Sequence, residues 1–148
     1  MARTILKDLL SSKSTIILDG AMGTELQRRD VDTGLPLWSA NALMVHPEVV
    51  LQIHKDYIEA GADIITTNTF RTTRRTFRRA NLPDRSLQFT KSAVALARKA
   101  RDEFPDRHRL KIVTGQTLFR KTLTSLQNIR RLLSVLRVKV STSFFLRR

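Results

Sequence analysis

The chain has 148 residues, enough for one domain, and its hydrophobic content of 41% is enough for a buried core, which excludes a disordered protein. Cysteine is absent, which excludes a disulfide scaffold and any thiolate metal site built from this chain alone. The net charge of +14 is uneven: residues 1–114 carry 19 basic and 13 acidic residues, a net +6, whereas residues 115–148 carry 8 basic and no acidic residues. The excess of positive charge is therefore first of all a property of the tail, and only secondarily a sign of a nucleic-acid partner.

The first 14 residues are interrupted by charges and lack the continuous apolar core of a signal peptide. No stretch of the sequence approaches transmembrane length, so we expect a cytoplasmic protein. Within this segment, apolar residues at helical spacing predict a short amphipathic helix over residues 5–10.

The three apolar residues at 16–18 predict a short buried strand, which ends in Asp19 and Gly20. From Thr24 to Arg29 the pattern predicts a helix, with the Thr24 hydroxyl as its N-cap. A carboxylate after such a strand lies where α/β proteins bind ligands, at the carboxyl end of the strand. The alternative is a plain tight turn in which Asp19 caps the local backbone.

Residues 32–42 contain a glycine and a proline and predict a loop, which carries the single tryptophan, Trp38. This tryptophan either forms the floor of a pocket or packs against the core. The next segment predicts a helix: Pro47 suits its first position, an apolar stripe runs along it, and Gly61 suits a left-handed stop.

Residues 64–70 begin as an apolar strand and end in polar residues. Five arginines then recur between positions 71 and 79 and form a basic face if this segment is helical. That face is either a phosphate-binding surface or, as we favour, a solvated helix face, because no aromatic stacking set or groove-reading motif accompanies it.

Residues 85–104 predict a second long amphipathic helix, and residues 111–115 predict a third strand. Each of the three strands is apolar first and polar last, and the carboxyl ends of parallel strands share one side of a sheet. We therefore expect one site assembled from several strand ends in an α/β fold. A complete (β/α)₈ barrel needs about 250 residues, so the chain holds about three of the eight units.

The three histidines are weak candidates for metal ligands. His46 and His54 lie two helical turns apart, whereas paired ligands on a helix lie one turn apart. We therefore assign capping and surface roles to His46, His54 and His108.

Several motifs, in the right order and at the right spacing, resemble the homocysteine S-methyltransferase family. They are Leu18-Asp19-Gly20-Ala21-Met22-Gly23-Thr24-Glu25-Leu26, Leu37-Trp38-Ser39-Ala40, His46-Pro47-Glu48-Val49-Val50, His54-Lys55-Asp56-Tyr57 and Ala60-Gly61-Ala62-Asp63-Ile64-Ile65-Thr66-Thr67-Asn68-Thr69-Phe70. The resemblance covers about residues 14–115. It implies that residues 1–115 are the N-terminal portion of a (β/α)₈ TIM barrel, an incomplete homocysteine-binding domain, and that residues 116–148 are a basic tail unrelated to the family.

The resemblance implies transfer of a methyl group to the homocysteine thiol, which gives methionine. In the family a zinc ion bound by three cysteines holds the substrate thiolate, and the donor is a sulfonium or ammonium compound such as S-methylmethionine or betaine, or a methyl-cobalamin or folate in larger relatives. Asp19 and Gly20 match positions near the amino and carboxylate groups of homocysteine. Asn68, Thr69 and Phe70 match the strand end that lines the same pocket, and Trp38 falls where a pocket aromatic can lie.

The chain departs from the family pattern because it has no cysteine to bind zinc. We therefore expect no resident metal, no catalytic residue and no activity in this chain as written. In the tail, Leu, Arg and Ser, the three residues with six codons each, make up 17 of 34 residues, against 32 of the preceding 114. This composition is typical of a shifted or terminated reading frame, or of an unspliced segment. If the tail is instead a genuine part of the protein, its pattern predicts a basic amphipathic helix, with apolar residues from Leu126 to Val140 at spacings of three and four.

Two alternatives to an enzyme remain. One is a basic fragment that binds a nucleic acid or an acidic membrane surface, although the sequence carries no nucleic-acid motif. The other is a fragment that associates with a full-length barrel.

Overall fold

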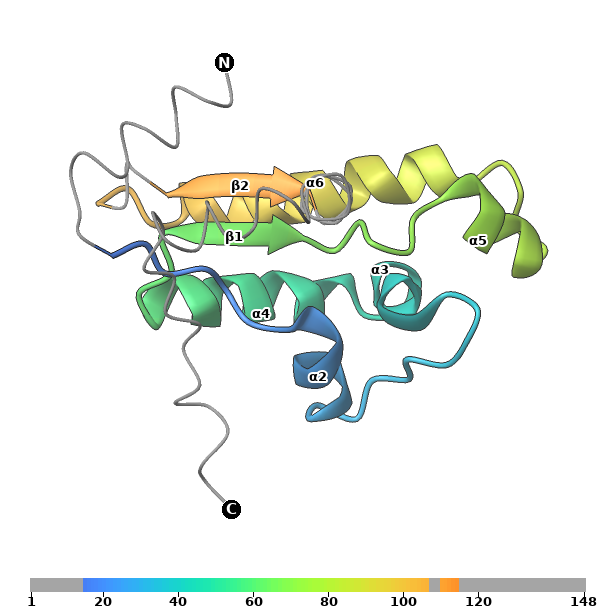
Figure 1. Ribbon diagram of the computed structural model, residues 1–148, viewed down its shortest axis with the longest axis horizontal. Helices are drawn as coiled ribbons and strands as arrows, with labels where there is room; N and C mark the ends of the chain where they lie inside the picture. Colours follow the sequence, from blue (N-terminus) through green and yellow to red (C-terminus); the bar gives the residue numbers. More distant parts are fainter. Residues whose placement is uncertain (1–14, 107–109, 115–148) are drawn as a thin grey trace, which may run out of the picture.

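The computed structural model describes residues 15–106 and 110–114 (Figure 1). The helix expected over residues 5–10, His108 and the pattern in the tail lie outside the described residues. The described elements follow a β/α order: α2 (Met22–Gln27), a 3₁₀ helix (Trp38–Asn41), α3 (Ala42–Val45), α4 (Pro47–Glu59), β1 (Ile64–Thr67), α5 (Arg74–Arg79), α6 (Ser86–Asp102) and β2 (Lys111–Thr114).

The sheet is parallel, as the crossover pattern predicts. β1 pairs with β2 in a register that places Ile65 opposite Ile112. The strand predicted over residues 16–18 is reduced to a single parallel bridge between Leu18 and Ile64. The physical reason is that the N–H of Ile17 donates to the carboxylate of Asp63 at 3.0 Å, so a side chain takes the place of a ladder partner.

The long helices cover one face of this sheet. Side chains alternate along β1: Ile65 is fully buried and packs with Ile58 of α4 and Ala97 of α6, whereas Thr66 points to the opposite face. In Figure 1, α4 and α6 both run along the strands, and the two helices contact one another. The face that carries Thr66 is free of these helices, and the polar residues of the site gather there.

Two expectations for helix ends are confirmed. α4 begins at Pro47, whose missing N–H costs no hydrogen bond at a first helical position. The helix stops before Gly61, which has a φ of +99°, and a side chain would be strained at that value. The same glycine leads directly into β1, so α4 and β1 are connected by the short loop that the sequence predicts.

A second apolar cluster joins α2, α3, α4, α5 and α6. At its centre Phe77 of α5 stacks on Phe89 of α6, with ring centroids 5.4 Å apart. Leu26 of α2 and Ile53 of α4 are fully buried in the same cluster. The core therefore extends beyond the sheet and fixes α5 and the segments before α4 to the two long helices.

Three local predictions are wrong. Thr24 does not cap α2, because the helix begins at Met22 and takes Ala21 as its N-cap, which leaves Thr24 inside the first turn. Residues 32–42 are not all loop, since a 3₁₀ helix spans Trp38–Asn41 and runs into α3. His54 is not on the surface: its side chain is fully buried in α4.

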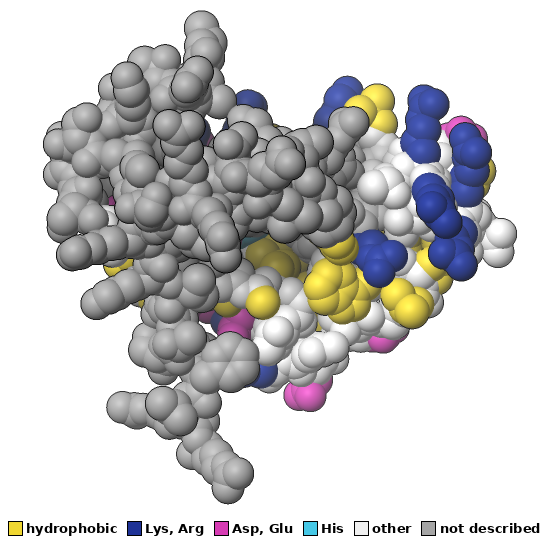
Figure 2. All heavy atoms as spheres, in the orientation of Figure 1, with side chains coloured by type: hydrophobic (Ala, Val, Ile, Leu, Met, Phe, Trp, Pro, Cys, Tyr) yellow, Lys and Arg dark blue, Asp and Glu magenta, His cyan; other side chains and the backbone are white. Residues whose placement is uncertain are grey.

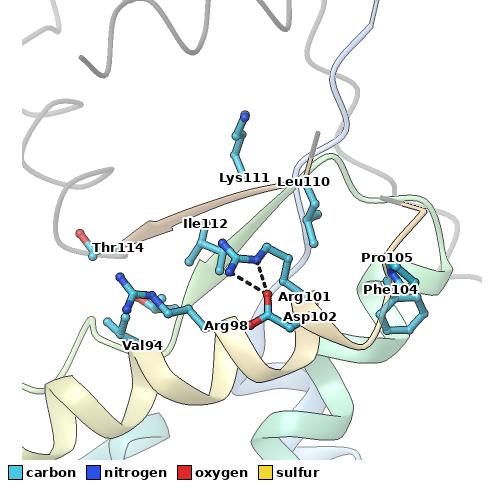
Figure 3. Close-up of a pocket in the computed structure, with 11 residues that line it drawn as sticks. Val94, Arg98, Arg101, Asp102, Phe104, Pro105, Leu110, Lys111, Ile112 and Thr114 are labelled. Carbon is cyan, nitrogen blue, oxygen red and sulfur yellow. Dashed lines mark hydrogen bonds and ion pairs between the residues drawn. The ribbon is translucent and has the colours of Figure 1, made fainter. Parts of the chain in front are cut away.

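The outer side of β2 and α6 borders a cleft of about 650 Å³ (Figure 3). The cleft is lined by residues of α6, of β2 and of the segment between them, and within the described residues β2 pairs with one strand, β1. Arg101 is held there by Asp102, whose Oδ1 accepts from Nε of Arg101 at 2.8 Å. The remaining lining is apolar and basic: Val94, Arg98, Phe104, Pro105, Leu110, Lys111 and Ile112, with Thr67 and Thr114.

Candidate functional site

Asp19 is held in place at the carboxyl end of the parallel strands. Its Oδ2 accepts a hydrogen bond from the backbone N–H of Thr66 at 2.6 Å, and its Oδ1 accepts one from the Thr66 hydroxyl at 2.8 Å. The backbone N–H of Asp19 donates to the carbonyl of Ile64 at 2.9 Å, as part of the parallel bridge between Leu18 and Ile64. Both oxygens are therefore oriented by β1, on the face of the sheet opposite α4 and α6.

The Asp19 carboxylate is held in an environment that disfavours its charge. Burial raises the pKa of Asp19 from 3.8 to about 6, against the opposing effect of the hydrogen bonds from Thr66. Near neutral pH this group is therefore mostly ionised but close to its titration range. A cation placed beside it would lower the pKa again, so the site favours a positively charged ligand group.

Gly20 provides room for the ring of Tyr57. A Cβ added at Gly20 would lie 2.6 Å from the Tyr57 hydroxyl oxygen, so any larger residue would displace the phenol. Burial, and then the nearby carboxylates of Glu25 and Asp19, raise the pKa of Tyr57 to about 12. Tyr57 therefore stays neutral and presents a hydroxyl next to the carboxylate of the site.

Trp38 packs between α2 and the segment that follows β1. A Cβ at Gly23 would lie 2.7 Å from Cζ2 of Trp38, and the indole meets the Phe70 ring edge-on with centroids 6.1 Å apart. Trp38 has a φ of +49°, an uncommon value for a residue with a side chain. Phe70 remains 39% exposed, so the aromatic pair presents an apolar surface to solvent.

Asn68 and Thr69, which follow β1, are both buried. The side-chain amide of Asn68 donates to the carbonyl of Ser39 at 2.7 Å and so holds the 3₁₀ helix that begins at Trp38. Thr69 is 1% exposed, and its hydroxyl lies 2.9 Å from that of Thr67. In this structure both residues hold the backbone around the aromatic pair in place.

The residues predicted for the site therefore form two neighbouring groups joined by β1 and its continuation. Asp19 and Gly20 make one group, and Trp38 and Phe70 make the other, while Asn68 and Thr69 hold the second group in place. Sequence reasoning missed Thr66, which orients Asp19, and Tyr57, which covers Gly20. Thr66 could have been found from its place among the polar residues at the strand end, whereas Tyr57 resembles any apolar member of its helix stripe.

The residues do not fit the zinc site that the family resemblance implies. The sequence contains no cysteine, and within the described residues no three His, Cys, Asp or Glu side chains group closely enough to hold a metal ion. Nδ1 of His46 instead lies 3.2 Å from a carboxylate oxygen of Glu48 at the start of α4.

In the described part of the chain, no helix combines the length and the apolar character needed to cross a bilayer.

Comparison with known proteins relates most of the chain to one family. The family profile described as homocysteine S-methyltransferase matches residues 16–139, a range that runs past Gly115. The homocysteine S-methyltransferase YbgG of Bacillus subtilis is 38% identical over 100 residues, which are 67% of this chain and 32% of that protein. A selenocysteine methyltransferase of Astragalus bisulcatus is 36% identical over 109 residues, 72% of this chain and 32% of that protein.

Solved structures point the same way. The homocysteine methyltransferase MmuM of Escherichia coli, in its metallated form, superposes with a TM-score of 0.69 at 34% identity. The match covers 74% of this chain and 40% of that chain. The present chain therefore spans about a third of the length of the curated relatives it matches.

Proposed function

Because this chain belongs to the homocysteine S-methyltransferase family, we propose that it forms the N-terminal part of a (β/α)₈ barrel and that this part binds homocysteine. The parallel strands with helices on one face support this architecture, since the helices of such a barrel form its outer ring. The face that carries Thr66 then points into the barrel, where such enzymes place their sites at the carboxyl ends of the strands.

The observation that carries the proposal is the carboxylate of Asp19, which Thr66 holds through both oxygens. The amino group of homocysteine is a cation at neutral pH, and an oriented, partly buried carboxylate is its natural partner. The neutral hydroxyl of Tyr57, close to Gly20, supplies a donor and an acceptor beside it. The exposed surface of Phe70 suits the apolar methylene groups of the ligand.

We expect Asp19→Asn to weaken homocysteine binding by at least about tenfold, because a charged hydrogen-bond partner contributes about 1.5–3 kcal/mol. Affinity in the parent chain should fall as the pH is lowered from 7 to 5, since Asp19, with a pKa of about 6, becomes protonated and loses its charge. Calorimetric titration of the full chain across this range measures both effects.

The matched control is Asp32→Asn, which removes an exposed carboxylate that accepts from the N–H of Gly34 in a surface loop. This control should keep both the affinity and its pH dependence. Equal weakening by the two substitutions, or a pH dependence that persists in Asp19→Asn, would contradict the assignment of Asp19.

We also propose that the cleft beside β2 receives further β/α units of such a barrel. The cleft borders β2, whose one strand neighbour within the described residues is β1, and MmuM extends well beyond the part that this chain matches. The lining combines apolar contacts from Val94 and Ile112 with the cations Arg98 and Lys111, which suits an apolar helix with acidic flanks.

Co-expression with the C-terminal two-thirds of the E. coli homocysteine S-methyltransferase tests this part of the proposal. The full chain should co-purify with that fragment, and Val94→Asp should abolish the association because it places a charge in the apolar part of the cleft. Val45→Asp is the matched control, since Val45 is 50% exposed on α3 and does not line the cleft. Co-purification that survives Val94→Asp would show that the cleft is not the contact.

A further inference from the structure

A second cavity, of about 520 Å³, lies beside α5 and is unrelated to the Asp19 carboxylate. Its lining consists of three arginines, one threonine and two apolar residues: Arg71, Arg75, Arg79, Thr76, Leu35 and Pro36. Figure 2 shows basic side chains gathered around α5, next to hydrophobic ones. No acidic residue contributes to the lining, so the cavity is cationic on one wall and apolar on the other.

Within residues 15–106 and 110–114, the arginines of this segment have no counter-charge. Arg74 and Arg78 extend from α5 together with Arg75 and Arg79, whereas Arg71 precedes this helix. None of the five forms an ion pair with a described residue. Like charges three or four residues apart on a helix repel each other. The fold therefore tolerates a repulsion here that an anion would relieve.

Arg71 differs from the other arginines of this segment because part of its side chain is buried. Its Nε is buried and has no hydrogen-bond partner, although a buried donor of this kind almost always finds one. Its guanidinium carbon lies 5.8 Å from the centroid of the Phe70 ring, so the side chain is positioned by an aromatic face. A half-buried, oriented guanidinium whose buried Nε has no partner, at the wall of a cavity, is the feature that a surface arginine lacks.

The backbone that presents these arginines is firmly fixed. The Thr73 side chain caps α5 by accepting from the N–H of Thr76 at 3.2 Å. The Thr72 hydroxyl donates to the carbonyl of Thr69 at 3.1 Å and accepts from the Thr90 hydroxyl at 2.7 Å, which ties the start of α5 to α6. The arginines are thus held by a rigid support, which lowers the entropic cost of binding a ligand.

We propose that the cavity lined by Arg71, Arg75 and Arg79 binds a small anion with two or more phosphate groups. Guanidinium groups bind phosphate oxygens in a bidentate manner, and three of them match a linear oligophosphate better than a single anion. The apolar wall of Leu35 and Pro36 leaves room for an uncharged organic group attached to that anion. Binding here is independent of homocysteine and of methyl transfer.

Tripolyphosphate is the probe, titrated into the full chain by calorimetry. We expect one strong site, and a loss of affinity of at least about fivefold in each of Arg71→Gln, Arg75→Gln and Arg79→Gln. Arg75 and Arg79 are exposed, so their substitution leaves the core intact even if Arg71→Gln disturbs the packing on Phe70. The emission of Trp38, the single tryptophan, should change on binding because its ring contacts Phe70.

Arg78→Gln is the matched control, because this arginine belongs to α5 but does not line the cavity, and it should change the affinity less than twofold. Arg130→Gln with Arg131→Gln controls for binding to the basic tail. Equal losses for Arg78→Gln and Arg75→Gln, or a loss confined to the tail variant, would overturn the proposal. So would oligothymidylate that binds more tightly as it lengthens and outcompetes tripolyphosphate, since that result indicates a diffuse nucleic-acid surface.

Discussion

The purified chain, supplied with homocysteine, a methyl donor and zinc, is expected to form no methionine above a protein-free control. An ordinary thiol has a pKa of about 8.5 and is only a few per cent ionised at pH 7, so the thiol needs activation before it can attack a methyl group. The relatives are far longer than this chain, and the chain has no cysteine that could bind a metal ion for this purpose. Chromatographic detection of methionine, with S-methylmethionine and betaine as separate donors, measures the outcome.

The E. coli homocysteine S-methyltransferase is the positive control for this assay. Methionine formed by the purified chain, and lost in Asp19→Asn, would contradict the expectation and show that activation of the thiol needs no cysteine of this chain. Activity that appears only when the C-terminal part of the E. coli enzyme is added would instead agree with the proposed barrel, in which the two parts share one site.

The parts of the fold that depend on local physics were predictable from the sequence. Pro47 and Gly61 mark the ends of α4 because one lacks an N–H and the other tolerates a positive φ, and neither property needs tertiary context. The two strands that follow the long helices were predictable from their apolar runs. The shared polar face followed from the rule that parallel strands end on one side of a sheet.

What could not be predicted depends on contacts between distant residues. The strand at 16–18 is shortened because the Asp63 carboxylate takes the N–H of Ile17. The 3₁₀ helix at Trp38 is held by Asn68, a residue 29 positions from its acceptor at Ser39. For the same reason the bond between the Asn68 amide and the carbonyl of Ser39 was not predictable, because the sequence shows that an amide is present but not which partner it bonds.

His54, the histidine in the core, should make the stability of the fold depend on pH. Both ring nitrogens of His54 are buried without a hydrogen-bond partner, and burial lowers its pKa from 6.5 to about 4. The unfolded chain therefore binds a proton near pH 6.5 that the folded chain does not bind until about pH 4. This histidine's contribution to stability is complete above pH 6.5 and falls as the pH is lowered, by about 3 kcal/mol at pH 4.

Asp19 acts in the opposite direction over nearly the same range. Its pKa is raised from 3.8 to about 6, so the folded chain binds a proton more tightly than the unfolded chain does. Its contribution to stability is complete below pH 3.8 and is lost as the pH rises to 6, again by about 3 kcal/mol. Between pH 6.5 and 4 the two contributions to stability therefore largely cancel. The free energy of unfolding of the parent chain should then show neither contribution.

Two substitutions separate these contributions to stability. Acidification from pH 6.5 to 4 should stabilise His54→Leu relative to the parent, because this variant lacks the imidazole whose protonation destabilises the fold. The same acidification should destabilise Asp19→Asn relative to the parent, because this variant lacks the carboxyl whose protonation stabilises the fold. Urea denaturation followed by circular dichroism at each pH measures the difference from the parent, so that titration of all other groups cancels. His46→Leu, which replaces an exposed imidazole, is the matched control, and its curve of stability against pH should run parallel to that of the parent.

Parallel curves for all four proteins would show that neither buried group is coupled to folding. Curves that diverge in opposite directions would show that the acid response of this fold is set by one carboxyl in the candidate site and one imidazole in the core.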